Sequence, residues 1–187
     1  MKHEIWLMRH GETAWSLSGQ HTSRTDLPLT AEGERLAAEL KIRLRGREFT
    51  QVLASPMGRA IKTCRLAGLE PHETTKDLCE WDYGDYEGLT TPEIQRTAPG
   101  WTIWTGSVPN GETAAQVAER ADRLIERAVN VPGDVAFFAH GHFLRVLGAR
   151  WISMDPTFGA RLALSTGSIC VLGYERDTRV LKVWNQT

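Results

Sequence analysis

Three short apolar runs, each leading into polar residues at the start of a helix-like segment, constrain the fold of this chain most. They are Ile5-Trp6-Leu7-Met8, Gln51-Val52-Leu53-Ala54 and Val135-Ala136-Phe137-Phe138-Ala139. A short apolar run between turn signals is typical of a strand that is buried on both faces. Because long helical segments separate the three runs, we expect these strands to pair in parallel within an α/β fold.

Capping signals predict two of the helices that cover this sheet. Thr30 precedes acidic residues and an apolar periodicity that continues to Leu44, which predicts a helix over this segment. Thr113 and Gln116 form a capping-box pattern, and helical spacing of apolar residues follows until Asn130. Near the C-terminus, residues 168–174 and 180–184 alternate like two strands of a hairpin at one edge. The sheet is therefore expected to be mostly parallel but mixed.

The residues that follow the apolar runs carry matching chemistry. Arg9-His10-Gly11 ends the first run, Ser55 and Pro56 predict the start of a helix with Arg59 in its first turn, and His140-Gly141-His142 ends the third run. Ligands of open α/β sheets bind at the carboxyl ends of the strands. Arg9, Arg59 and His140, together with free N–H groups at two helix starts, would form a cationic cup for a phosphoryl group.

His10 is the predicted nucleophile of this site. An unprotonated imidazole attacks phosphorus near neutral pH without prior loss of a proton from a weak acid. Arg9, Arg59 and His140 would stabilise the charge on the transferred group. Gly141 follows His140 at its junction, and Thr13, Ser16 and Gln20 follow the nucleophile. We expect these four to contact phosphate or substrate.

Several segments together resemble the histidine phosphatase, or phosphoglycerate mutase-like, superfamily. The segments are Arg9-His10-Gly11-Glu12-Thr13, Ser55-Pro56 with Arg59-Ala60, Glu80-x-x-x-Gly84-x-x-Glu87-Gly88, Gly111-Glu112-Thr113 and Ala139-His140-Gly141-His142. The resemblance implies one domain over residues 1–187, folded as a three-layer α/β/α sandwich. It also places Glu80 at the position of the general acid, with Asp82 and Glu87 as the next candidates.

Two blocks of the sequence resemble one branch of that superfamily, which contains sugar bisphosphatases and actinobacterial acid phosphatases. These blocks are residues 15–22 and 80–91. Mutases of the superfamily usually carry Asn where this chain has Ser16 and Arg where it has Gln20. They also usually have a longer insertion after the acid, whereas here only residues 89–110 are available. The resemblance implies a phosphatase of small phosphorylated metabolites, with sugar phosphates or bisphosphates favoured. A cofactor-dependent phosphoglycerate mutase and a catalytically silent phosphate-binding protein are the alternatives.

Composition limits the partners of such an enzyme. The 187 residues carry 22 Lys and Arg against 23 Asp and Glu, and the formal net charge is −1. No overall basic field therefore recruits nucleic acid or an anionic membrane. The N-terminal residues lead into the first strand without an apolar leader, and the three cysteines lack metal-site spacing. We expect a cytoplasmic location, a small phosphorylated substrate, and no cofactor or metal. A homodimer is left open.

Some roles stay open at the level of sequence. His142 reads as a residue that packs or orients neighbours, and a metal site built on His140-x-His142 would need a further carboxylate or histidine ligand. Trp81, Trp101 and Trp104 fit the entrance of the site and the core equally well. The physiological substrate depends on the shape of residues 81–110, which the sequence does not specify.

Overall fold

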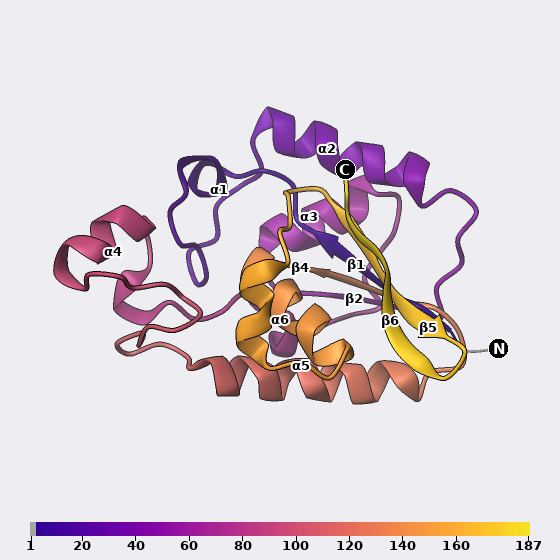
Figure 1. Cartoon of the computed structure of the whole chain (residues 1–187). Coiled ribbons are helices and arrows are strands. Elements are labelled where there is room, and N and C mark those ends of the chain that lie inside the picture. Colours follow the sequence, from indigo (N-terminus) through magenta and orange to yellow (C-terminus); the bar gives the residue numbers. More distant parts are fainter. Residues whose placement is uncertain (1–2) are drawn as a thin grey trace.

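The computed structural model describes residues 3–187 and is built on a single six-stranded sheet (Figure 1). Its strands are β1 (Ile5–Arg9), β2 (Gln51–Ala54), β3 (Glu73–Thr74), β4 (Val135–Ala139), β5 (Ile169–Glu175) and β6 (Thr178–Gln186). Its α-helices are α1 (Ala14–Ser18), α2 (Ala31–Arg43), α3 (Gly58–Leu66), α4 (Thr91–Thr97), α5 (Ala114–Val129) and α6 (Gly141–Trp151). Short 3₁₀ turns lie at Lys76–Leu78, Gly84–Tyr86 and Pro156–Arg161.

The strand order β3-β2-β4-β1-β5-β6 places β1 and β4 at the centre of the sheet. β4 is parallel to both β1 and β2, and β2 is parallel to β3. β5 runs antiparallel to β1 and forms the C-terminal hairpin with the edge strand β6. The expectation of a mostly parallel, mixed sheet with a hairpin at one edge is confirmed.

Side chains of the central strands alternate between two separate cores. In β1, Ile5 and Leu7 pack with α5 and α6, whereas Trp6 and Met8 pack with α2 and α3. Figure 1 shows α2 and α3 on one side of the sheet and α5 and α6 on the other. Strands covered on both faces must be apolar throughout, which explains the unbroken apolar runs in the sequence. The α/β/α layering is therefore confirmed.

Three of the helix starts follow capping signals in the sequence. Thr30 caps α2, and Thr113 with Gln116 forms the capping box of α5. Thr90 and Glu93 form the same box at α4, in a segment where no helix was predicted. Each box satisfies N–H groups that a helix start otherwise leaves without a partner.

Helices α1 and α4 lie together beyond one end of the sheet (Figure 1). The backbone N–H of His21 bonds the Leu89 carbonyl at 2.9 Å, and Gln20 forms an isolated bridge with Thr90. The segment after α1 and the segment before α4 thus form one roof. This roof stands over the end of β1 at which Arg9 and His10 emerge.

Candidate active site

His10 is fixed at the carboxyl end of β1 by the strand on each side. Its backbone N–H bonds the Ala139 carbonyl of β4 at 3.0 Å, and its own carbonyl accepts the N–H of Gly167, ahead of β5, at 3.1 Å. The next residue, Gly11, passes the first turn of α2 so closely that a Cβ there would lie 2.2 Å from the Gly33 carbonyl oxygen. Only glycine fits at this crossing, so steric crowding against α2 explains why a glycine follows the nucleophile.

The ring of His10 is held as a neutral imidazole. Its Nδ1 lies 2.7 Å from the Gly11 carbonyl oxygen. A carbonyl only accepts hydrogen bonds, so Nδ1 carries the proton and Nε2 keeps its lone pair. Burial, and then the charges of Arg9 and Arg59, lower the pKa of His10 well below 6.5. His10 therefore presents a free nucleophilic nitrogen at neutral pH.

The predicted cationic cup of Arg9, Arg59 and His140 forms around this ring. The guanidinium of Arg59, a residue that is 1% exposed, donates to the carbonyls of Ser23 and Thr25 at 3.0 and 2.9 Å. Arg9 bonds the Leu164 carbonyl at 2.5 Å. The His140 ring meets the His10 ring edge to face, with centroids 5.1 Å apart.

Buried polar atoms without a partner mark this cup as an anion site. Within residues 3–187, four buried side-chain nitrogen or oxygen atoms lack a hydrogen-bond partner, and three of them are Arg9 Nε, Arg59 Nε and His140 Nδ1. Such an atom costs about 1–3 kcal/mol when it is left unsatisfied. A phosphoryl group carries acceptor oxygens that satisfy several donors at once. The described residues thus fit a phosphate at His10.

The two helix starts contribute less to the cup than predicted. α3 begins at Gly58 with Met57 as its N-cap, so the prediction of Ser55 as cap and Pro56 as first helical residue is wrong. The Ser55 hydroxyl instead lies 2.8 Å from His140 Nε2. Ser55 therefore bonds His140, which lies far along the chain, and Met57 takes the N-cap position of α3.

Carboxylates occupy most of the N–H groups that were expected to be free at the helix starts. The Gly58 N–H of α3 donates to Asp26, and the His142 and Phe143 N–H groups of α6 donate to Glu80. The prediction of two open helix N-termini is wrong in this respect. Gly141 lies against the guanidinium of Arg9, since a Cβ there would lie 3.1 Å from Arg9 Cζ. The cup is consequently made chiefly of side chains.

Glu80 is held beside the cup with one oxygen less engaged than the other. Its Oε1 accepts the N–H groups of Trp81 and Phe143 at 2.9 and 2.8 Å, whereas Oε2 accepts the His142 N–H at 3.0 Å. Glu80 also lines the cavity into which His10 opens. The geometry leaves Oε2 as the oxygen able to exchange a proton with a substrate.

The cavity at His10 has a volume of about 360 Å³. Its walls include the following predicted residues: Arg9, His10, Thr13, Ser16, Gln20, Glu80 and Gly141. Arg59 and His140 lie beneath the wall rather than on it, since both are almost fully buried. The structure therefore brings the whole predicted set together in two layers.

The three predicted loop residues have structural hydrogen bonds of their own. Thr13 and Ser16 form the capping box of α1, with the Ser16 hydroxyl 2.8 Å from the Thr13 N–H. The Gln20 amide donates to the Gly88 carbonyl at 2.8 Å. Their side chains reach the cavity wall while they hold the roof in place.

Two residues of the outer cavity wall, Tyr83 and Arg145, have no role assigned in the sequence analysis. Tyr83 Oη lies 2.6 Å from His142 Nδ1, and burial followed by the charge of Arg145 lowers the pKa of His142 well below 6.5. Arg145 stands over the Trp104 ring at 4.5 Å. Arg145 is three residues after His142 on α6, so helical spacing is the signal that would have found it.

The three tryptophans and His142, whose roles are open at the level of sequence, divide between the core and the cavity wall. Trp81 and Trp101 are buried in the core, and Trp104 lines the cavity. His142 lines the cavity as well. Across residues 3–187, no group of three His, Cys, Asp or Glu side chains is arranged to hold a metal ion. In the same range, no helix is long and apolar enough to cross a membrane.

Comparison with known proteins places this geometry in a family. Residues 5–187 match the model of the histidine phosphatase superfamily (branch 1). An acid phosphatase of Mycobacterium tuberculosis is 44% identical over 99% of this chain and 93% of its own length. A sedoheptulose 1,7-bisphosphatase of Saccharomyces cerevisiae is 37% identical over 79% of this chain and 67% of its own.

A solved structure gives the same result for the fold. The product of an M. tuberculosis open reading frame superimposes with a TM-score of 0.96 and 42% identity, covering 100% of this chain and 99% of that one. The family model, the acid phosphatase and the solved structure each match nearly the whole length of the chain. This chain belongs to branch 1 of the histidine phosphatase superfamily.

Proposed function

We propose that this protein hydrolyses phosphomonoesters of small metabolites through a phosphorylated His10. One observation carries the proposal. A neutral imidazole with a free Nε2 lies among two orphaned guanidinium donors, on Arg9 and Arg59, and the unpartnered Nδ1 of His140, a set that suits a phosphoryl group. The related acid phosphatase and sedoheptulose bisphosphatase support this reaction class.

The reaction proceeds in two displacements at phosphorus. In the first, His10 Nε2 forms a bond to phosphorus while the bond to the leaving oxygen breaks, and that oxygen takes the proton of Glu80. In the second, a water oxygen attacks phosphorus, the bond to His10 breaks, and Glu80 takes a proton from the water. Glu80 returns to its initial state, and inorganic phosphate leaves. The cationic cup stabilises the equatorial oxygens in both steps.

The outer wall of the cavity favours sugar phosphates and bisphosphates as substrates. Gln20, Thr102 and His142 offer polar groups for hydroxyls, and Arg145 adds a second cationic centre. A cavity of about 360 Å³ accommodates a phosphorylated sugar. A bisphosphate would place its second phosphate against Arg145 while the first occupies the cationic cup.

The test is a phosphate-release screen over sugar monophosphates, sugar bisphosphates and p-nitrophenyl phosphate, with phosphoglycerate interconversion assayed in parallel. We expect hydrolysis and an acid-labile phosphoenzyme. His10→Ala should abolish the label and lower turnover on the order of 10⁴-fold or more, as loss of a nucleophile does elsewhere. His72→Ala, which changes an exposed histidine outside the cavity, is the matched control.

Three outcomes would contradict the proposal. Normal turnover by a folded His10→Ala variant would remove the phosphohistidine mechanism. Transfer of the phosphoryl group to phosphoglycerate much faster than to water would replace the phosphatase with the mutase. Tight phosphate binding without any turnover would leave the phosphate-binding alternative.

We also propose a cytoplasmic location. Cys64, Cys79 and Cys170 are all free thiols, as is usual for a reducing compartment. Cell fractionation with an antibody to the protein tests the location, and recovery in a secreted fraction would overturn it.

A further inference from the structure

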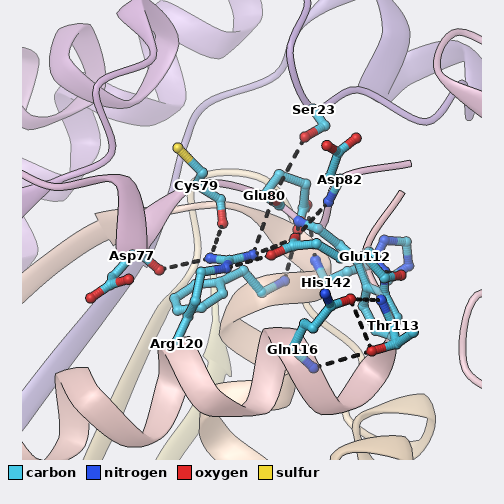
Figure 2. Close-up of polar contacts among 12 residues, drawn as sticks. Ser23, Asp77, Cys79, Glu80, Asp82, Glu112, Thr113, Gln116, Arg120 and His142 are labelled. Carbon is cyan, nitrogen blue, oxygen red and sulfur yellow. Dashed lines mark hydrogen bonds and ion pairs between the residues drawn. The ribbon is translucent and has the colours of Figure 1, made fainter. Parts of the chain in front are cut away.

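An ion pair between the buried Arg120 and the partly buried Glu112, outside the cavity wall, holds the segment that carries Glu80 (Figure 2). Arg120, on α5 and 9% exposed, donates to Glu112 from Nε and Nη2, each at 2.8 Å. Its remaining donors reach three main-chain carbonyls, those of Asp77 at 2.8 Å, Cys79 at 3.0 Å and Glu80 at 3.4 Å. A guanidinium has five N–H donors, and this arrangement uses all of them.

Glu112 fixes the residues on the other side of Glu80. Its Oε2 accepts the Asp82 N–H at 2.9 Å, and its own N–H bonds the Asp82 carbonyl at 2.9 Å. The Glu112 carbonyl accepts the indole N–H of Trp81 at 2.8 Å. Every residue from Cys79 to Asp82 is therefore tied to the Glu112–Arg120 pair.

The carboxylate of Glu80 is fixed from the opposite side by α6. Phe143 donates its N–H to Oε1, and the ring of the same Phe143 lies against the Arg120 guanidinium, with Cζ 4.9 Å from the ring centroid. Arg120 thus supports both the backbone of Glu80 and the helix that holds its carboxylate.

Stability alone is a weak reason for such a pair. Desolvation of two buried charges offsets most of their attraction, and well-packed apolar residues often serve equally well. A bidentate pair with three further carbonyl partners does, however, define one backbone geometry. Geometry matters at a catalytic carboxyl group, because a displacement of about 1 Å can cost on the order of 100-fold in rate.

We propose that Glu112 and Arg120 are positioning residues that aim Glu80 Oε2 at the leaving-group oxygen. The proposal rests on the proposed function, in which Glu80 protonates that oxygen. A defect in the pair should therefore act on the acid step and leave the cationic cup unchanged. It should depend on how much the leaving group needs a proton.

The test compares single-turnover phosphorylation of the enzyme by a sugar phosphate and by p-nitrophenyl phosphate. Lysine keeps the charge of Arg120 but cannot reach Glu112 and three carbonyls together. We expect Arg120→Lys to lower the rate of enzyme phosphorylation by the sugar phosphate about 10–100-fold. The rate with the aryl phosphate should fall by less than about 3-fold. Inhibition by inorganic phosphate should stay at the wild-type level.

Arg123→Lys is the matched control. Arg123 lies on the same helix and binds the Asp77 side chain at the surface, at 2.6 Å, without touching Glu112 or the Glu80 carbonyl. It should leave both rates unchanged. If Arg120→Lys fails to unfold cooperatively, Glu112→Gln provides the same measurement, because it keeps the volume but removes one charge of the pair.

A double variant separates positioning from a general loss of structure. In the Glu80→Gln background, Arg120→Lys should not lower the phosphorylation rate with the sugar phosphate any further. The carboxyl group that Arg120 positions is already absent from that variant. Equal losses for both substrates, or additive losses in the double variant, would overturn the inference. Absence of any wild-type hydrolysis would instead overturn the proposed function, so the two failures are distinguishable.

Discussion

The inner and outer parts of the cavity are built in different ways. The inner part comprises His10 and the cationic cup, whose residues emerge directly from β1, β4 and the first turn of α3. The outer part comprises Gln20, Trp104, His142 and Arg145, and two of these four come from loops. The inner part is fixed by the sheet, while the outer part depends on how the roof segments meet.

The difference assigns separate tasks to the two parts. A sheet edge holds side chains rigidly, as the charge stabilisation of a phosphoryl transition state requires. Loops on that scaffold vary in length and sequence without disturbing the core, so they suit discrimination between substrates. Changes in the inner part should therefore lower turnover of every substrate, and changes in the outer part should alter preference.

After loss of the nucleophile His10 itself, the largest expected effect in this comparison comes from Arg59. Arg59→Ala removes a cation of the cup and should lower turnover of all substrates by about 10²–10³-fold, the scale of losing one transition-state donor. Vanadate should lose its competitive inhibition. Steady-state kinetics on a sugar phosphate and on p-nitrophenyl phosphate measure both effects.

Lys62→Ala is the control for Arg59→Ala. Lys62 lies on the same helix but is half-exposed and pairs with Glu34. Wild-type kinetics in a folded Arg59→Ala variant would mean that Arg59, with its bonds to the Ser23 and Thr25 carbonyls, has a structural role only.

Sequence reasoning succeeded for the inner part because its signals are local. An apolar run that breaks at Arg9-His10-Gly11 indicates both a strand and what its end delivers, and β4 repeats the pattern at His140. Parallel pairing of these strands then brings the two histidines together without further information. The resemblance supplied Glu80, which the structure places on the cavity wall.

The errors and omissions arise from contacts between distant residues. Ser55 has the local sequence of an N-cap, yet its hydroxyl bonds His140, 85 residues away in the chain. The N–H groups at the start of α6 looked free, yet Glu80 reaches them across more than 60 residues. The strand β3 has two residues and no periodicity to detect. Tertiary structure overrides local preference at each of these points.

A moderate effect is expected from Arg145 in the outer part. Arg145→Met keeps the aliphatic stem over Trp104 but removes the charge. We expect KM for a sugar bisphosphate to rise by about 10-fold or more, the value of one charge-assisted hydrogen bond, with little change for p-nitrophenyl phosphate. Arg161→Met, at an exposed arginine that does not line this cavity, is the control. A uniform loss across substrates would make Arg145 part of the inner machinery.

The smallest effect is on stability, and it involves histidines from both parts. Burial is the main cause that lowers the pKa values of His10, His140 and His142 well below 6.5. In the unfolded chain each histidine has a pKa of about 6.5. Between that value and the lowered folded value, only the unfolded chain binds the proton. The stability gained by keeping these rings neutral is therefore fully present above pH about 6.5 and is lost as the pH falls.

Each of these histidines should contribute about 1.4 kcal/mol per pH unit to that loss while only its unfolded form is protonated. Urea unfolding of wild type, His140→Asn and His142→Asn between about pH 5 and 7 measures the slopes. The carboxylates are the same in all three proteins, so a difference in slope isolates one histidine.

We expect both variants to have shallower slopes. Saturating sulfate should flatten the wild-type slope because an anion in the cup favours protonated His140, whereas His142 lies outside the cup and should keep its contribution. Equal slopes in all three proteins would mean that these buried rings accept protons as readily when folded as when unfolded.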